Sequence, residues 1–129
     1  MSKVKLPTLL IVDDEPAIRL LLNEFLQRKF RITTLNGGFA CLQHLQETEP
    51  DVLIIDLNMP DISGLEVIRR IRANSSWNRI AIIVLSAEES SKDRISCLRA
   101  GADDYIVKPF NPQELDARIE AILRRTAFK

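Results

Sequence analysis

The chain has 129 residues, of which 46% are hydrophobic, and its 18 basic and 18 acidic residues give a formal net charge of zero. This length predicts one domain with enough apolar residues for a core, and the balanced charge argues against a nucleic-acid or membrane surface spread over the whole domain. The longest apolar run, Ile80–Leu85, is too short to span a bilayer, and no signal segment opens the chain, so we expect a cytoplasmic protein.

Five apolar segments predict β-strands. Each is a short run of aliphatic or β-branched residues bounded by turn residues. The third run ends abruptly in the carboxylate of Asp56 and predicts a strand that is buried on both faces. The five segments are Thr8–Val12, Arg31–Leu35, Val52–Ile55, Ile80–Leu85 and Asp104–Val107.

Apolar residues at helical spacing follow each strand. Pro16 suits the first turn of the first helix, and the apolar positions after it predict one buried stripe. That stripe consists of Ile18, Leu21, Leu22, Phe25 and Leu26. In the second helical pattern, His44 is the only histidine and has no partner at metal-ligand spacing, so we expect a surface side chain.

The later helices carry clear start and stop residues. In the fourth helix we expect Ile95 and Leu98 to face inward and Gly101 to end the helix. Asn111 and Pro112 should cap and start the last helix. The two cysteines, Cys41 and Cys97, both fall in helical patterns, and we expect them to be reduced, buried and structural.

Strands that alternate with helices predict an α/β fold with a parallel sheet covered by helices on both faces. Right-handed crossovers limit the topology. Among doubly wound (βα)5 sheets we choose the strand order 2-1-3-4-5.

Polar residues follow four of these strands. They are Asp13 and Asp14, Asp56, Ser86 and Lys108. Because the carboxyl ends of parallel strands share one edge of a sheet, these side chains should converge there. The acids and the serine also have local alternatives: an Asp at a strand end can start a turn or cap the next helix, and Ser86 can be an ordinary strand-end hydroxyl.

Three converging carboxylates would repel one another, and one lysine cannot neutralise them all. Mg²⁺ fits such a site, because it prefers a few carboxylates and water, and Mn²⁺ could substitute for it. Zinc is disfavoured, because no cysteine or second histidine lies nearby. A carboxylate beside Mg²⁺ and Lys108 can attack phosphorus in line, which would give an aspartyl phosphate.

The sequence resembles the receiver domains of two-component response regulators, which have the CheY-like (flavodoxin-like) fold. The motifs are Val12-Asp13-Asp14, residues 55–64, Leu85-Ser86-Ala87 and residues 101–110. The resemblance covers about residues 9–125, so we expect a single receiver domain over 1–129 with a core of about 8–125.

The resemblance implies a role for each residue at the strand ends. Asp56 would be the phosphoacceptor. Asp14 would ligate Mg²⁺ directly, Asp13 would do so mainly through water, and the carbonyl of Asn58 would complete the protein ligands. Lys108 would contact the phosphoryl group.

Two further positions, Ser86 and Tyr105, would carry the response to phosphorylation. Ser86 occupies the switch position, where Thr is commoner in this family. Tyr105 would be the aromatic residue that turns inward on activation, and the Lys108–Pro109 bond would be cis. Asn58 and Glu88 match side chains that border the path of the hydrolytic water, and their alternative is that both are simply solvated.

The chain is most similar to receivers of the bacterial winged-helix (OmpR/PhoB-type) transcription factors. That similarity predicts a homodimer through the fourth helix, fifth strand and fifth helix. Its intermolecular ion pairs would be Arg94 with Glu114 and Asp104 with Arg118, and the alternative is a solvated face of mixed charge. The expected partner is a sensor histidine kinase or a histidine phosphotransfer protein, with no direct nucleic-acid or membrane binding by this domain.

Other classes of function fit less well. A phosphatase of the haloacid-dehalogenase type needs a second Asp two residues after the nucleophile, where this chain has Asn58. A receiver-shaped module that is never phosphorylated would not need the complete acidic set, and a flavin-binding protein would not place Asp13, Asp14 and Glu15 where a phosphate must bind. We therefore expect no metabolic enzyme but a domain that catalyses its own phosphorylation and dephosphorylation, either alone or as the front of a longer regulator.

Overall fold

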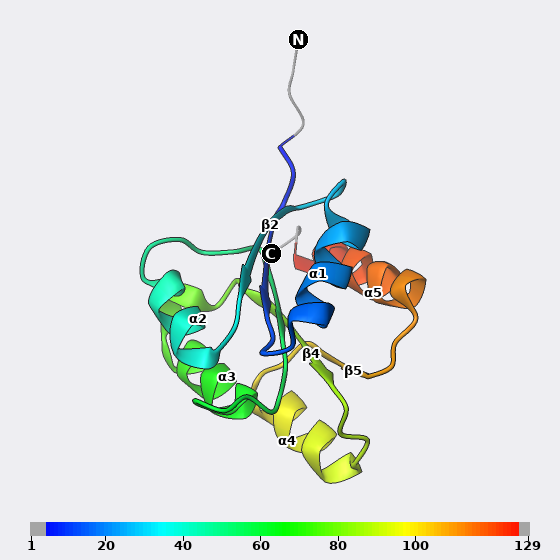
Figure 1. Ribbon diagram of the computed structural model, residues 1–129. Helices are drawn as coiled ribbons and strands as arrows, with labels where there is room; N and C mark the ends of the chain where they lie inside the picture. Colours follow the sequence, from blue (N-terminus) through cyan, green and yellow to red (C-terminus); the bar gives the residue numbers. More distant parts are fainter. Residues whose placement is uncertain (1–4, 127–129) are drawn as a thin grey trace.

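A computed structural model describes residues 5–126 as one five-stranded parallel sheet between two layers of helices (Figure 1). The strand order is β2-β1-β3-β4-β5, which confirms the predicted order. The elements are β1 (Thr8–Val12), α1 (Pro16–Leu26), β2 (Arg31–Leu35), α2 (Gly38–Leu45), β3 (Val52–Ile55), α3 (Gly64–Ala73), the 3-10 turn η1 (Ser75–Trp77), β4 (Ala81–Ser86), α4 (Ser91–Ala100), β5 (Asp104–Val107) and α5 (Pro112–Thr126).

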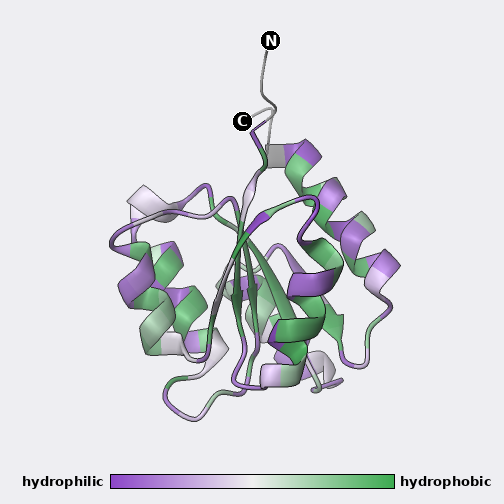
Figure 2. Cartoon of the chain, turned by 45° about the horizontal axis from the view of Figure 1, so that its top comes forward, coloured by the Kyte–Doolittle hydropathy of each residue, from purple (hydrophilic) through white to green (hydrophobic). Residues whose placement is uncertain are grey.

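The sheet separates two apolar cores, because successive residues of a strand point to opposite faces. In β1, Leu9 and Ile11 pack with α1 and α5, whereas Leu10 and Val12 pack with α2, α3 and α4. Figure 2 shows the apolar strands enclosed by helices whose outer sides are hydrophilic. β3 and β4 are buried along their whole length, as their continuous apolar runs predict, while the edge strand β2 is mostly exposed.

Register aligns the ends of the strands and so fixes where the functional residues lie. Val12 pairs with Ile55, Ile55 with Val84, and Ser86 with Val107. The residues that follow β1, β3 and β5, together with the last residue of β4, therefore reach the same edge of the sheet.

The prediction of one buried stripe on α1 is wrong in part. Leu22 and Leu26 are buried, but Leu21 is 47% exposed and Phe25 is 40% exposed. The sequence places three leucines in succession, from Leu20 to Leu22, and a helix turns about 100° per residue, so they cannot all face one sheet.

The prediction that Ile95 and Leu98 face inward is also wrong, because they are 46% and 42% exposed. The buried residue of α4 is Cys97, and Ala100, three residues later on the same side, packs against the same core. Cys41 and Cys97 are both free and buried, as expected. Gly101 ends α4 at a φ of 122°, a conformation that favours glycine.

Among residues 5–126, no helix combines the length and the apolar character needed to cross a bilayer.

Candidate functional site

Three carboxylates meet at the ends of β1 and β3. Asp56 donates its backbone N–H to the carbonyl of Val12 at 2.9 Å, which continues the pairing of the two strands and brings Asp56 beside Asp13. Asp13, Asp14 and Asp56 each place a carboxylate oxygen within 4.8 Å of the others. Asp13 is 2% and Asp56 6% exposed, whereas Asp14 lies at the surface. Two of the three charges are therefore largely removed from water.

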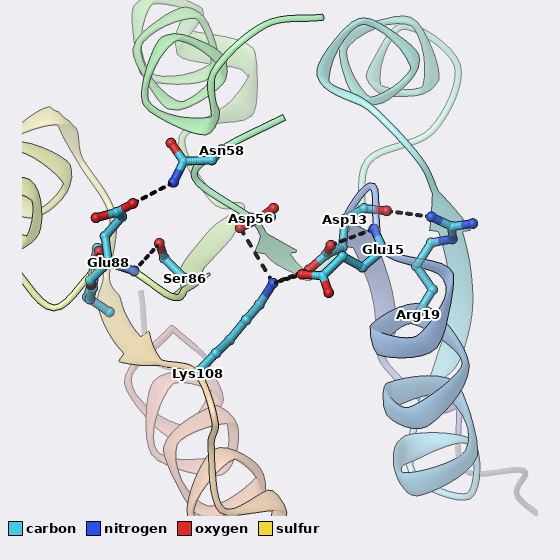
Figure 3. A network of polar contacts seen from close by, with 9 residues as sticks. Asp13, Glu15, Arg19, Asp56, Asn58, Ser86, Glu88 and Lys108 are labelled. Carbon is cyan, nitrogen blue, oxygen red and sulfur yellow. Dashed lines mark hydrogen bonds and ion pairs between the residues drawn. The ribbon is translucent and has the colours of Figure 1, made fainter. Parts of the chain in front are cut away.

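Lys108 reaches this cluster from the end of β5, and its backbone N–H donates to the carbonyl of Ser86 at 2.7 Å. Its Nζ lies 2.9 Å from Oδ2 of Asp13 and 3.6 Å from Oδ1 of Asp56. Figure 3 shows the side chain extending between the two carboxylates. The Lys108–Pro109 peptide bond is cis. Lys108 is the one cation that contacts both buried acids in the described part of the chain.

Burial and charge together set the proton affinities in the site. Burial, and then the charge of Asp13, raise the pKa of Asp56 to about 6, although Lys108 acts in the opposite direction. Burial alone would lower the pKa of Lys108, but the hydrogen bond and charge of Asp13 and the charge of Asp56 raise it above its ordinary value. The lysine is therefore charged at neutral pH and leaves a net negative site.

This donor set fits a hard divalent cation. The oxygens of Asp13, Asp14 and Asp56 are close enough to share one ion, and carboxylates are ligands that Mg²⁺ accepts. Burial is the largest cause of the raised pKa of Asp56, and repulsion from Asp13 and Asp14 adds to it in spite of Lys108. A cation held by these oxygens would remove that repulsion.

Helix capping does not explain the acids after β1. The N-cap position of α1 is Glu15, and no side chain caps it there. Asp13 accepts a hydrogen bond from the backbone N–H of Glu15 at 2.9 Å, so Asp13 has a local structural role. Asp14 has no such role, and its carboxyl instead raises the pKa of Asp56.

Glu88 joins three residues that the sequence analysis singled out. Its backbone N–H donates to Oγ of Ser86 at 3.1 Å, and its carbonyl accepts from the hydroxyl of Tyr105 at 2.8 Å. Its carboxylate accepts a hydrogen bond from Nδ2 of Asn58 at 3.2 Å, so these two exposed side chains contact each other (Figure 3). These contacts join the loops that follow β3 and β4 next to the acidic cluster.

Tyr105 already lies in the protein interior. Its side chain is 7% exposed, and the guanidinium of Arg94 lies 5.7 Å from the centre of its ring. Burial raises the pKa of Tyr105 above its ordinary value.

Three residues of the expected ion-pair face pair with one another within the chain. Nη1 of Arg118 lies 3.0 Å from Oδ2 of Asp104, and its Nε lies 3.0 Å from Oε2 of Glu114. Arg94 contacts Tyr105 and not Glu114. The intermolecular pairing of these four residues stays a prediction.

The sequence analysis gave no site role to two residues that contact the cluster. Oε1 of Glu15 lies 3.2 Å from Nζ of Lys108, and Nη1 of Arg19 donates to the carbonyl of Asp13 at 2.6 Å. Glu15 could have been found as the third acid of the run after β1. Arg19 carries no signal in the sequence, because its contact depends on how α1 leaves the sheet.

Comparisons with known proteins agree on one family. A model described as "response regulator receiver domain" matches residues 9–120. The phosphate regulon transcriptional regulatory protein PhoB of Rhizobium meliloti is 42% identical over 121 residues, which are 93% of this chain and 53% of that protein. The transcriptional regulatory protein PrrA of Mycobacterium leprae is 42% identical over 95% of this chain and 52% of its own.

Solved structures show the same similarity. The BeF3-activated receiver domain of DrrB has a TM-score of 0.84 at 32% identity, covering 93% of this chain and 99% of that one. The chemotaxis response regulator CheY4 of Vibrio cholerae has a TM-score of 0.85 at 30% identity, covering 92% and 99%. The chain spans about half the length of the curated relatives it matches.

Proposed function

The chain belongs to the receiver domain family of two-component response regulators, and from that premise we propose that Asp56 is its phosphoacceptor. The single observation that carries the proposal is the position of Asp56: a buried carboxylate with a raised pKa, next to two further acids and one lysine. An oxygen of Asp56 attacks the phosphorus of a phosphohistidine. The new O–P bond forms as the P–N bond breaks, and the imidazole leaves.

Asp14 and Asp56, with the backbone carbonyl of Asn58, would hold Mg²⁺ directly, and Asp13 would hold it mainly through water. The acidic cluster supports this assignment. When bound, the ion neutralises charge on the transferring phosphoryl oxygens and on the carboxylates. Mn²⁺, with the same preference for oxygen ligands, could replace it.

Lys108 and Ser86 would bind the remaining phosphoryl oxygens. The ammonium of Lys108 lies 3.6 Å from Asp56 already, so a phosphoryl group on that carboxylate comes within its reach. Ser86 is fully buried, and its hydroxyl oxygen accepts a hydrogen bond from the backbone N–H of Glu88. The hydroxyl proton can be donated to a phosphoryl oxygen.

Phosphorylation adds about −1.5 to −2 charge and three acceptor oxygens. If Ser86 turns toward the new group, it leaves the N–H of Glu88, and the loop that also holds Tyr105 must adjust. This would change the face formed by α4, β5 and α5, where Arg94, Asp104, Glu114 and Arg118 lie. We propose that the altered face controls dimerisation or an effector.

The phosphoryl donor is proposed to be a sensor histidine kinase or a histidine phosphotransfer protein. Asn58 and Glu88 would set the lifetime of the phosphorylated state, because their hydrogen bond joins the two loops beside Asp56. The chain would thus catalyse its own phosphorylation and dephosphorylation and convert no external metabolite.

One experiment tests the assignment of Asp56. The protein is incubated with acetyl phosphate and Mg²⁺, and its intact mass is measured for wild type, Asp56→Asn and Asp51→Asn. Asp51 precedes β3, so it lies at the opposite end of the strand that leads to Asp56. We expect one phosphoryl group on wild type and on Asp51→Asn, and none on Asp56→Asn. A label that persists on Asp56→Asn would assign the acceptor to another residue.

A further inference from the structure

The N-terminus of α2 is capped by a residue that comes 24 positions after its N-cap residue. The N-cap residue is Gly37, which has no side chain to accept a hydrogen bond. The backbone N–H groups of Gly38 and Phe39 instead donate to the two carboxylate oxygens of Asp61, at 3.2 Å and 2.9 Å. Asp61 lies in the loop between β3 and α3, which is residues 56–63 and is called the acceptor loop below.

The start of α2 lies directly against the tip of the acceptor loop. A Cβ atom placed on Gly37 would have the side chain of Asp61 as its nearest contact, at 2.9 Å. A Cβ atom on Gly38 would overlap the side chain of Ile62 and lie 2.9 Å from Val67. Two adjacent glycines therefore allow the approach that the Asp61 hydrogen bonds require.

The far end of the acceptor loop is fixed separately. The N–H of Gly64 donates to the carbonyl of Leu57 at 2.8 Å, and a Cβ atom on Gly64 would overlap the backbone oxygen of Asp56. Ser63 caps α3 by accepting from the N–H of Glu66 at 3.1 Å. The loop thus returns to its own start, and Asn58 lies in the part between this closure and the tip.

We propose that Asp61 is a positioning residue, whose carboxylate fastens the acceptor loop to α2 and so holds the Asn58 carbonyl in place for a divalent cation beside Asp56. This inference rests on the proposed function, because it concerns the same metal site. The hydrogen bonds from Phe39 and other backbone groups keep the pKa of Asp61 below its ordinary value. The side chain is therefore ionised at neutral pH, and its charge also favours the N-terminus of α2.

If Asp61 only caps α2, restoring the cap by another residue should restore Mg²⁺ binding as well. A pair of variants distinguishes this role from the positioning role. Asp61→Ala removes both the cap of α2 and the loop anchor. In that background Gly37→Ser can restore the cap alone, because the Asp61 atoms that lie close to Gly37 are gone. The backbone of Gly37, with φ −167° and ψ 168°, is extended and suits any residue.

We expect Asp61→Ala to weaken Mg²⁺ binding about tenfold, as the loss of residues that orient metal ligands does. In Gly37→Ser/Asp61→Ala the urea midpoint should recover, while the Mg²⁺ dissociation constant should stay raised. In the metal-free protein, amide hydrogen exchange of residues 57–63 should be faster in both variants than in wild type. Recovery of the Mg²⁺ constant together with stability would show that Asp61 is only a helix cap.

If Asp61→Ala fails to fold, Mg²⁺ binding is measured on Asp61→Asn. Its amide oxygen can accept one of the two backbone bonds, so we expect a smaller rise in the Mg²⁺ constant in the same direction. A Mg²⁺ constant equal to that of wild type would overturn the proposal. Labelling of wild type with acetyl phosphate, measured in parallel, tests the proposed function separately. Mg²⁺ binding and amide hydrogen exchange decide the role of Asp61 whether or not the protein is labelled.

Discussion

Lys108 bonds more closely to Asp13 than to the proposed acceptor. Its Nζ lies 2.9 Å from Oδ2 of Asp13, in a hydrogen bond that joins residues 95 positions apart in the sequence. The distance to Oδ1 of Asp56 is 3.6 Å. One ammonium therefore offsets the charge of a largely buried acidic cluster, and its removal should be costly until another cation replaces it.

We expect Lys108→Met to lower the free energy of unfolding by about 1–3 kcal/mol in metal-free buffer, because it leaves two buried carboxylates without their cation. Added Mg²⁺ should reduce this loss. The matched control is Lys29→Met, which breaks the more exposed pair with Asp116 and should cost much less than Lys108→Met. Urea unfolding with and without Mg²⁺ measures both. Equal losses for the two variants, unaffected by Mg²⁺, would contradict this view of the site.

Asp56→Asn should stabilise the metal-free protein, and the gain should depend on pH. The native carboxyl keeps its proton up to a pKa of about 6, whereas the ordinary value is 3.8. The native state therefore binds more protons than the unfolded state between these values, so wild type loses stability as pH rises from about 4 to 6. Above about pH 7 we expect Asp56→Asn to be more stable by about 1–3 kcal/mol.

Denaturation curves at several pH values in the presence of a chelator measure this difference. Asp51→Asn, at the other end of the same strand, is the control for the removal of a carboxylate outside the site. A stability difference between Asp56→Asn and wild type that stays constant from pH 4 to pH 7 would mean that the surroundings do not raise the pKa of Asp56.

The arrangement of the site was predictable because it depends on the sheet alone. Continuous apolar runs such as Val52–Ile55 identify buried parallel strands, and the alternation with helices fixes their direction. Once the strand order is chosen, the residues after the strands share one edge, so Asp13 and Asp56 must be neighbours. The strand order therefore predicts which strand-end residues lie together, but not which of their side-chain atoms contact each other.

Contacts made by helices and loops were not predictable in this way. Apolar spacing on α4 suggested that Ile95 and Leu98 face inward, but Cys97 occupies the inward side. An apolar residue on a helix can lie on either side when the helix packs with only part of its surface. The bond between Asp61 and the start of α2 joins segments whose approach depends on Gly37 and Gly38, and no periodic pattern reports it.

Tyr105 is the only tyrosine of the chain, so its ionisation can be followed by ultraviolet absorbance without interference from another tyrosine. Burial raises its pKa above the ordinary 10.0, whereas a hydrogen bond from Ser86 lowers it. We expect the native protein to titrate above pH 10, and Ser86→Ala to raise that pKa further. The native state holds the phenolic proton longer than the unfolded state, so stability should fall as pH rises beyond 10. A native titration at the ordinary value would show that the ring is not held inside.

Some residues that would form ion pairs in the predicted dimer already have partners within the single chain. Arg118 already pairs with Asp104 and Glu114, and Arg94 lies over Tyr105. Exposed ion pairs contribute only about 0.2–1 kcal/mol each, so such pairs can exchange partners at little cost. The exposed side chains of Ile95 and Leu98 on α4 supply apolar area that the ion pairs lack.

We therefore expect beryllium fluoride with Mg²⁺, as a phosphoryl mimic at Asp56, to shift the protein from monomer to dimer in light scattering. Leu98→Glu should abolish the shift, because it places a charge in the apolar part of the face. Arg94→Ala should weaken dimerisation by about two- to thirtyfold, because across a two-fold axis it removes two symmetric exposed pairs. Arg99→Ala is the matched control, since it removes another exposed arginine of α4 that makes none of these contacts. Wild type that remains monomeric at high concentration with the mimic bound would remove the dimer from the mechanism and leave the face to another partner.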